Sequence, residues 1–200
     1  MARKAGGVRF VATVVALDLL LLAVLRTSLD VDLEALAVSA RWTARYAVVW
    51  FLGAFTASAL VRRWPGPVTR WILERRRWIG VSFAITLYVH LGVLVEMAWR
   101  WPDEFLGAIP IPSLVVGGTT YAFVLAQALT SNDAAVRWLG AARWRRLHLI
   151  GSHLVWLALL LGTVPRALQA PPWWALTVAI GALVPLRIRT RSTRRDGRSA

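Results

Sequence analysis

The sequence predicts an all-α protein, a bundle of six transmembrane helices whose N- and C-termini both lie in the cytoplasm. Of the 200 residues, 58% are hydrophobic and 17% are charged, and the mean hydropathy is +0.56. This composition is too apolar for a soluble domain of that length. The apolar residues fall into six runs, each near the roughly 20 residues that a spanning helix needs. Basic and acidic residues alternate between the connections that join these runs.

The first apolar run, Phe10 to Leu25, follows a short basic segment, a pattern that secretory signal peptides share. Three features favour a retained transmembrane helix instead. The run is longer than a usual signal core, Asp18 interrupts it, and the small-residue stretch Ala37 to Ala40 lies far downstream. We therefore expect this run to remain in the protein as its first span.

Five further apolar runs complete the predicted bundle, and no linker is long enough to divide it. Their approximate limits are Ala44–Val61, Trp78–Trp99, Pro112–Leu129, Leu147–Val164 and Trp173–Leu186. A single transmembrane domain is expected over residues 1–188. The basic segment 189–200 is expected to be a disordered cytoplasmic tail that lies against the lipid surface.

Charge in the connections orients the bundle. Arginines crowd the tail and the connections after spans two and four, whereas acidic residues occupy the connections after spans one, three and five. Because basic connections stay in the cytoplasm, the N-terminus is expected inside, and the chain is expected to be a multi-pass protein of the plasma (inner) membrane. The net charge of +14 is therefore attributed to loops that face anionic lipid, and no nucleic acid partner is expected.

Ionisable side chains within the hydrocarbon are costly, so each is a candidate functional residue. They are Asp18 in span one, His90 and Glu96 in span three, and His148 and His153 in span five. Cysteine is absent, which excludes disulfides, thiolate metal sites and iron–sulfur clusters. Any chemistry must therefore use imidazole, carboxylate, arginine or a bound cofactor.

Imidazoles on two different spans are what a six-coordinate b-type haem needs, because one ligand approaches the iron from each face. At 1.5 Å per residue, His90 lies about 20 Å deep when counted from Arg77, and His153 and His148 lie about 12 Å and about 4.5 Å deep when counted from Arg145. His148 and His153 are about 140° apart around a helix, so at most one is expected to bind a given haem. From spacing alone, haem ligation and simple hydrogen bonding to a neighbouring helix are equally favoured.

Asp18 is expected to be protonated and hydrogen-bonded within the bundle, and a role as a proton relay is the alternative. A transporter with a proton path through Asp18 and Glu96 would need helices broken near the midplane. The prolines Pro110, Pro112 and Pro165 lie at span edges instead, which disfavours a transporter.

Two stretches resemble the ferric-reductase-like transmembrane domain family, and within it the branch of haem-binding membrane subunits of bacterial methionine sulfoxide reductase systems. The first joins Arg76-Arg77-Trp78-Ile79-Gly80 to Tyr88-Val89-His90, and the second joins Thr130-Ser131-Asn132-Asp133, Trp138-Leu139-Gly140 and Arg143-Trp144-Arg145-Arg146-Leu147-His148. The Trp-Arg-Arg-Leu-His element is the most specific part. The resemblance covers roughly Arg41 to Leu161.

The resemblance implies ligands in pairs on spans three and five, and hence one or two b haems. His90 and His148 match two of the four ligand positions, and Arg76, 14 residues before His90, stands at a third as in the methionine sulfoxide reductase branch. The fourth position, 13 residues after His148, is Leu161, which cannot bind iron. The expected haem-binding groups are therefore His90 with His153 first, and His148 with Arg76 second.

The resemblance also implies a function, the passage of single electrons across the bilayer from a cytoplasmic flavin or quinol donor to a periplasmic redox partner. The sequence contains no flavin or nicotinamide signature, so the chain is expected to work as a subunit and not as an autonomous reductase. The alternative is a haem-free membrane structural or interaction protein of the same fold, which Leu161 favours.

Overall fold

The computed structural model describes residues 2–28, 32–169, 174, 177–178 and 180–182, and the described residues form helices and no strand. The helices are α1 (Ala2–Ser28), α2 (Leu33–Arg63), α3 (Pro67–Arg100), α4 (Pro102–Ala108), α5 (Ile111–Leu129), α6 (Asp133–Leu139) and α7 (Ala141–Gln169). The prediction of an all-α protein is confirmed over these ranges.

Five helices in the described part are long and apolar enough to cross a membrane, namely α1, α2, α3, α5 and α7. They coincide with the first five predicted spans. The sixth predicted span, Trp173–Leu186, lies mostly outside the described residues. Within it, Ile180 is buried, and its carbonyl accepts a hydrogen bond of 2.7 Å from the indole Nε1 of Trp156 on α7.

The two longest helices, α2 and α3, each begin 11 residues before the apolar run that predicted them. At the start of α2, the carboxylate of Asp32 accepts a hydrogen bond of 2.7 Å from the backbone N–H of Ala35, which satisfies one of the free donors there. At the start of α3, Pro67 occupies the first helical position, where its fixed φ suits a helix. Caps thus set the helix ends, whereas an apolar run marks only the part of the helix within the hydrocarbon.

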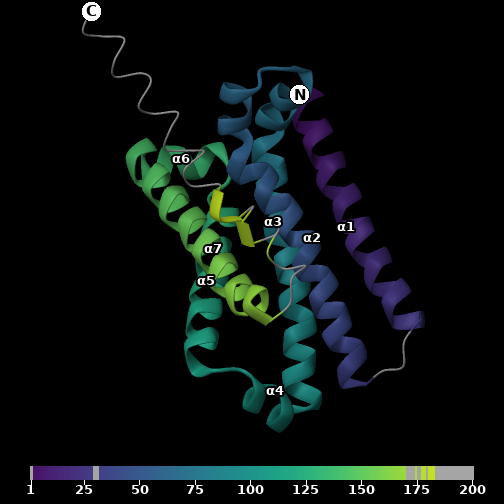
Figure 1. Ribbon diagram of the computed structural model, residues 1–200. Coiled ribbons are helices and arrows are strands. Elements are labelled where there is room, and N and C mark those ends of the chain that lie inside the picture. Colours follow the sequence, from purple (N-terminus) through teal and green to yellow (C-terminus); the bar gives the residue numbers. More distant parts are fainter. Residues whose placement is uncertain (1, 29–31, 170–173, 175–176, 179, 183–200) are drawn as a thin grey trace, which may run out of the picture.

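The centre of the bundle is the antiparallel pair of α2 and α3. The ring centroids of Phe51 on α2 and Phe83 on α3 lie 5.3 Å apart, and Val124 of α5 and Val155 of α7 join the same buried cluster. In Figure 1, α1 lies on one side of this pair, and α5 and α7 lie on the other. Every other spanning helix is therefore placed by its contact with the α2–α3 pair or with α5.

Two contacts hold α1 parallel to α3. Near the start of α1, a side chain at Gly7 would overlap the indole ring of Trp78. Near its end, the guanidinium of Arg26 donates hydrogen bonds to both carboxylate oxygens of Glu96, which also pairs with Arg100 at 3.1 Å. The glycine allows a close approach at one end of the helix pair, and the ion pair closes the other end.

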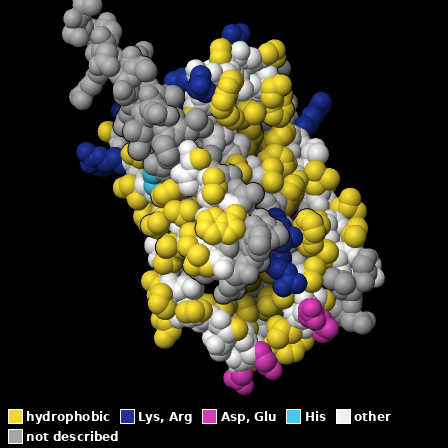
Figure 2. All heavy atoms as spheres, in the orientation of Figure 1, with side chains coloured by type: hydrophobic (Ala, Val, Ile, Leu, Met, Phe, Trp, Pro, Cys, Tyr) yellow, Lys and Arg dark blue, Asp and Glu magenta, His cyan; other side chains and the backbone are white. Residues whose placement is uncertain are grey.

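Charged residues separate to the two ends of the bundle. Figure 1 places the start of α1, the α2–α3 connection and α6 at one end, which we call the basic end, and α4 at the other, the acidic end. At the basic end, Arg77 of α3 pairs with Asp133 of α6 at 3.1 Å. Figure 2 shows acidic side chains at the end where α4 lies, some basic side chains close to them, and a largely hydrophobic surface over the rest of this face. The acidic side chains thus gather at the end that the acidic connections predicted.

The close contact at Gly7 can be tested with a neighbouring glycine as control. Gly7→Ala should lower the free energy of unfolding by about 1–3 kcal/mol, because the Trp78 ring must move out of a packed position. The change would appear as a lower melting temperature of the detergent-purified protein. Gly6→Ala, where nothing lies within 4 Å of the added carbon, should be neutral or slightly stabilising. Equal melting temperatures for the two variants would contradict the contact.

Candidate functional site

Helix α2 provides a common scale along which the histidines can be placed. The Nδ1 of His90 on α3 lies 3.2 Å from the hydroxyl of Thr43, and the ring of His153 on α7 meets Phe55 edge-on, with centroids 5.7 Å apart. Thr43 and Phe55 are 12 residues apart, which is about 18 Å along the helix. The structure therefore does not bring His90 and His153 together, because the two rings contact well-separated parts of α2.

Arg76 contacts the same part of α2 as His153. Arg76 on α3 donates hydrogen bonds to the carbonyl of Ala54 (2.9 Å) and the hydroxyl of Ser58 (3.3 Å) on α2. These residues flank the site where His153 meets α2, so the guanidinium of Arg76 and the ring of His153 lie at a similar level. His90, 14 residues after Arg76 on α3, is therefore well separated from His153 along the bundle.

The structure brings together three of the four predicted site residues. Arg76 lies close enough to His148 for its charge to act on the imidazole, and His153 follows His148 by five residues on α7. We call Arg76, His148 and His153 the basic-end cluster. His90 stands apart from it, nearer the acidic end.

The imidazole of His148 already has a partner for its Nε2. That atom lies 3.2 Å from the hydroxyl of Thr130, and this hydroxyl donates its hydrogen to the carbonyl of Ala126 at 2.6 Å. The hydroxyl therefore accepts from His148, whose Nε2 carries the proton by inference. The ring also stacks on Trp144 at 4.2 Å, and Gln127 donates a hydrogen bond of 3.0 Å to the His148 carbonyl. His148 is fixed from three sides.

The imidazole of His153 is fixed through the opposite nitrogen. Its Nδ1 lies 2.7 Å from the carbonyl oxygen of Leu149, which can only accept, so Nδ1 carries the proton. Nε2 then holds the lone pair, and it has no hydrogen-bond partner among the described residues. A ring with Nδ1–H bonded to a carbonyl and a free Nε2 is the form in which histidine binds a metal.

His90 presents the same tautomer at its own level. The hydroxyl of Thr43 donates to the carbonyl of Ser39 at 2.8 Å, so it accepts from the Nδ1–H of His90. Nε2 again holds the lone pair. Within the described part of the chain, no three His, Asp or Glu side chains gather as a metal site, so each imidazole would act as a single ligand.

The two acidic candidates, Asp18 and Glu96, both interact with side chains of other helices. Asp18 is fully buried, and the hydroxyl of Thr86 lies 2.9 and 3.2 Å from its two oxygens, which confirms the expected hydrogen bonding within the bundle. Glu96 forms the ion pair with Arg26 described above. It ties α1 to α3 and is not a free proton carrier.

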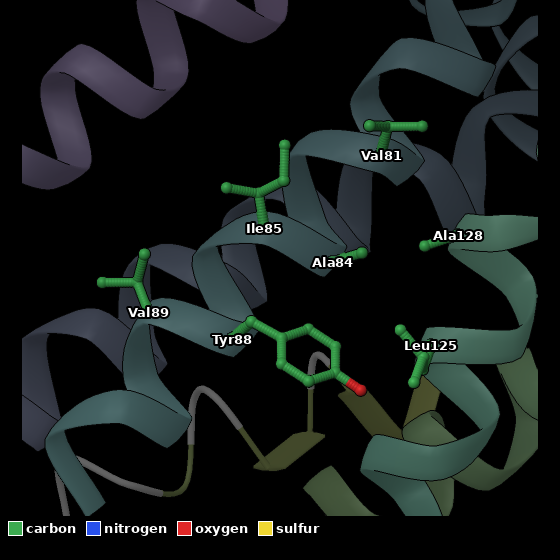
Figure 3. Close-up of a pocket in the computed structure, with 7 residues that line it drawn as sticks. All are labelled: Val81, Ala84, Ile85, Tyr88, Val89, Leu125 and Ala128. Atoms are coloured by element: carbon green, nitrogen blue, oxygen red, sulfur yellow. The ribbon is translucent and has the colours of Figure 1, made fainter.

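An apolar cavity of about 470 Å³ opens between α3 and α5, on a face that the histidines do not line. Tyr88 crosses it and donates a hydrogen bond of 2.9 Å to the carbonyl of Tyr121. Figure 3 shows the lining residues, which are Val81, Ala84, Ile85, Tyr88, Val89, Leu125 and Ala128. Because the walls offer no donor set for a metal, the cavity is separate from the imidazole sites.

Sequence reasoning missed the residues that orient the imidazoles, namely Thr43, Phe55, Gln127 and Thr130. Gln127 carried a usable signal, since a glutamine within an apolar run must find a partner inside the bundle. Thr43 and Thr130 carried no comparable signal, because the hydroxyl of a threonine in a helix can bond its own backbone.

These observations define the class of the protein: an all-helical, multi-span membrane protein with single imidazoles presented on two of its spans. Among curated proteins, the chain is similar to the protein-methionine-sulfoxide reductase heme-binding subunit MsrQ of Azospira oryzae, with 35% identity over 147 residues. The match covers 62% of this chain and 58% of that protein. The resemblance to this branch that the sequence predicted is confirmed. No family model matches the chain, and no solved structure matches it.

The contact between α5 and α7 at His148 can be tested by removing the Gln127 amide. Gln127→Leu should lower the free energy of unfolding by about 1 kcal/mol, since the His148 carbonyl loses its side-chain donor. Thr119→Val, which removes a hydroxyl bonded only to its own helix, is the control on α5 and should change the melting temperature less. A Gln127 variant as stable as the control would show that this hydrogen bond does not hold α7 in place.

Proposed function

We propose that the chain is an integral membrane protein that binds haem b and passes single electrons across the bilayer as a subunit of a redox system. The observation that supports this most is His153, whose Nδ1 is held by a carbonyl and whose Nε2 is open, beside Phe55 and level with Arg76. Similarity to a heme-binding subunit supports the same cofactor.

The basic-end cluster fits a haem by its donor set. His153 would bind the iron through Nε2, and Arg76 would hold a haem carboxylate by a charge-assisted hydrogen bond. Haem, when bound, supplies a one-electron iron couple. The Leu149 carbonyl keeps the His153 ring in the tautomer that can bind, and Phe55 covers its edge against water. His148 would pack beside the site through Trp144.

His90 would serve a second, separate site. With an axial offset of about 18 Å, His90 and His153 cannot both reach one iron, so we assign each to its own centre. Leu161 is 53% exposed and offers no donor to complete a pair. The site at His90 would therefore have one protein ligand, and the haem count would be one or two.

The charges at the two ends of the bundle support an orientation in the membrane and a partner on each side. Basic connections stay on the cytoplasmic side, so the basic end would face a cytoplasmic flavin or quinol donor, and the acidic end would face the periplasm of an inner-membrane protein. The relative's name couples it to a methionine sulfoxide reductase, so a periplasmic reductase is the proposed acceptor. A haem-free membrane protein of the same fold is the second candidate, favoured by Leu161 and by the distance between His90 and His153.

The visible spectrum of the purified full-length protein separates these functions. The protein, made with ample haem and purified in detergent, should show a reduced b-type band. His153→Ala should remove most of the absorbance of the basic-end centre, and His90→Ala should remove that of the second centre if both are filled. His148→Ala, on the same helix as His153, is the control and should keep the band, because the His148 ring is held by Thr130 at Nε2 and stacked on Trp144.

Two outcomes would decide against the proposal. Absence of a Soret band in folded wild-type protein would favour the haem-free alternative. A band that survives His90→Ala and His153→Ala but vanishes in His148→Ala would move the ligand to His148 and contradict the assignment.

A further inference from the structure

Asp18 is a carboxyl group buried at the middle of the membrane, and the electron-transfer function proposed above does not use it. Its side chain has 0% exposure. It lies nine residues after Arg9 and eight before Arg26, about 14 Å and about 12 Å along the helix. A carboxyl at such a depth is expensive to bury, so its surroundings show how it is tolerated.

The burial of Asp18, with no ion pair among the described residues, favours a bound proton. The hydroxyl of Thr86 lies 2.9 Å from one carboxyl oxygen and 3.2 Å from the other, and it can share its single hydrogen between them. Because a charged carboxylate without a basic partner is costly to bury, the neutral acid is the form that this environment favours. The ion pairs of the described residues join Arg26, Arg77 and Arg100 to other acids, and none includes Asp18.

A second observation, the buried hydroxyl of Ser82, points to the same site as Asp18. Ser82 precedes Thr86 by four residues on α3, so the two hydroxyls lie on one face of the helix, one turn apart. The Oγ of Ser82 is buried and has no hydrogen-bond partner among the described residues. Unpartnered buried hydroxyls in native proteins usually bind a water molecule, and a water here would extend the hydrogen bonds of Asp18 by one turn.

We propose that Asp18, Thr86 and Ser82 form a proton-binding site inside the membrane, which gains one proton when the chain accepts one electron. This inference rests on the proposed function. The Asp18 carboxylate would take up H⁺ to become the neutral acid, and the cytoplasmic flavin or quinol donor would supply the electron to a haem iron bound at His90. One positive and one negative charge enter together, so the buried region keeps its net charge.

The short distance between Asp18 and a centre held by His90 is the reason why proton uptake and reduction would be coupled. Thr86 precedes His90 by four residues on α3, so a centre held by His90 would lie roughly 10 Å from Asp18. A unit charge at that distance changes a proton affinity by roughly tenfold at an effective dielectric constant of about 20. An oxidised, positively charged centre would favour loss of the proton, and reduction would favour its return.

Two ionisable residues of α2 lie near this site, because Arg45 and Tyr46 line a pocket together with Leu17 and Leu21 of α1. Tyr46 of α2 lies within electrostatic range of Asp18, and His90 lies on α3. Farther toward the acidic end, Arg26 and Glu96 neutralise each other. Asp18 is therefore the acid in this part of the bundle that can respond to a redox centre.

The protonation of Asp18 is tested first, in haem-free protein. Infrared spectra of the full chain in lipid bilayers at neutral pH should contain the C=O stretching band of a protonated carboxylic acid. Asp18→Asn should remove the band, and Asp103→Asn, which changes an exposed acid of α4, should leave it. Ser82→Ala keeps Asp18 in place and should shift the band. A wild-type spectrum without the band, or a band that Asp18→Asn retains, would overturn the inference.

The coupling is tested in haem-loaded protein by redox titration at several pH values. The wild-type midpoint potential should fall as pH rises, by up to the tenfold change in equilibrium per pH unit that corresponds to about 59 mV for one electron. Asp18→Asn should flatten this dependence, and Asp103→Asn should not. A haem-loaded wild type with a pH-independent potential would overturn the coupling and leave the proposed function standing. A protein without haem absorption would overturn both.

Discussion

Inside a bilayer no water is present to satisfy polar groups, and most of the polar contacts in this bundle follow from that constraint. Helical hydroxyls bond back to their own backbone, as Thr56 does to Leu52 and Thr120 to Val116. Groups that cannot be satisfied within one helix are bonded to another. Asp18 reaches Thr86, and Arg76 reaches the backbone of α2. The polar contacts between helices therefore specify which helices are neighbours.

The imidazoles illustrate how one constraint produces different chemistry. His148 satisfies its Nε2 with a hydroxyl of α5, whereas His153 satisfies its Nδ1 with a carbonyl of its own helix. The second arrangement leaves the lone pair on Nε2, whereas in His148 the lone pair lies on Nδ1. The nitrogen that could bind a metal thus depends on which neighbour takes the ring proton.

Much of the fold could be predicted from the sequence, because bilayer thickness and loop charge act on residue type alone. The first five spans and the separation of basic from acidic connections are seen in the structure. Helix starts were predicted less well: Asp32 and Pro67 extend α2 and α3 beyond their apolar runs. The separation of His90 from His153 could not be judged from the sequence, because counting residues along each helix does not give the position of one helix along another.

The sequence by itself determined that the chain crosses the membrane, that its chemistry depends on imidazole, carboxylate and arginine, and that it resembles a haem-binding membrane subunit. Only the tertiary structure decided which of these groups meet. It brought Arg76 beside His148 and level with His153, and it held His90 about 18 Å away along α2. The physical reason is that hydropathy and charge depend on each residue separately, whereas the axial offset of two helices depends on how the side chains of both pack together.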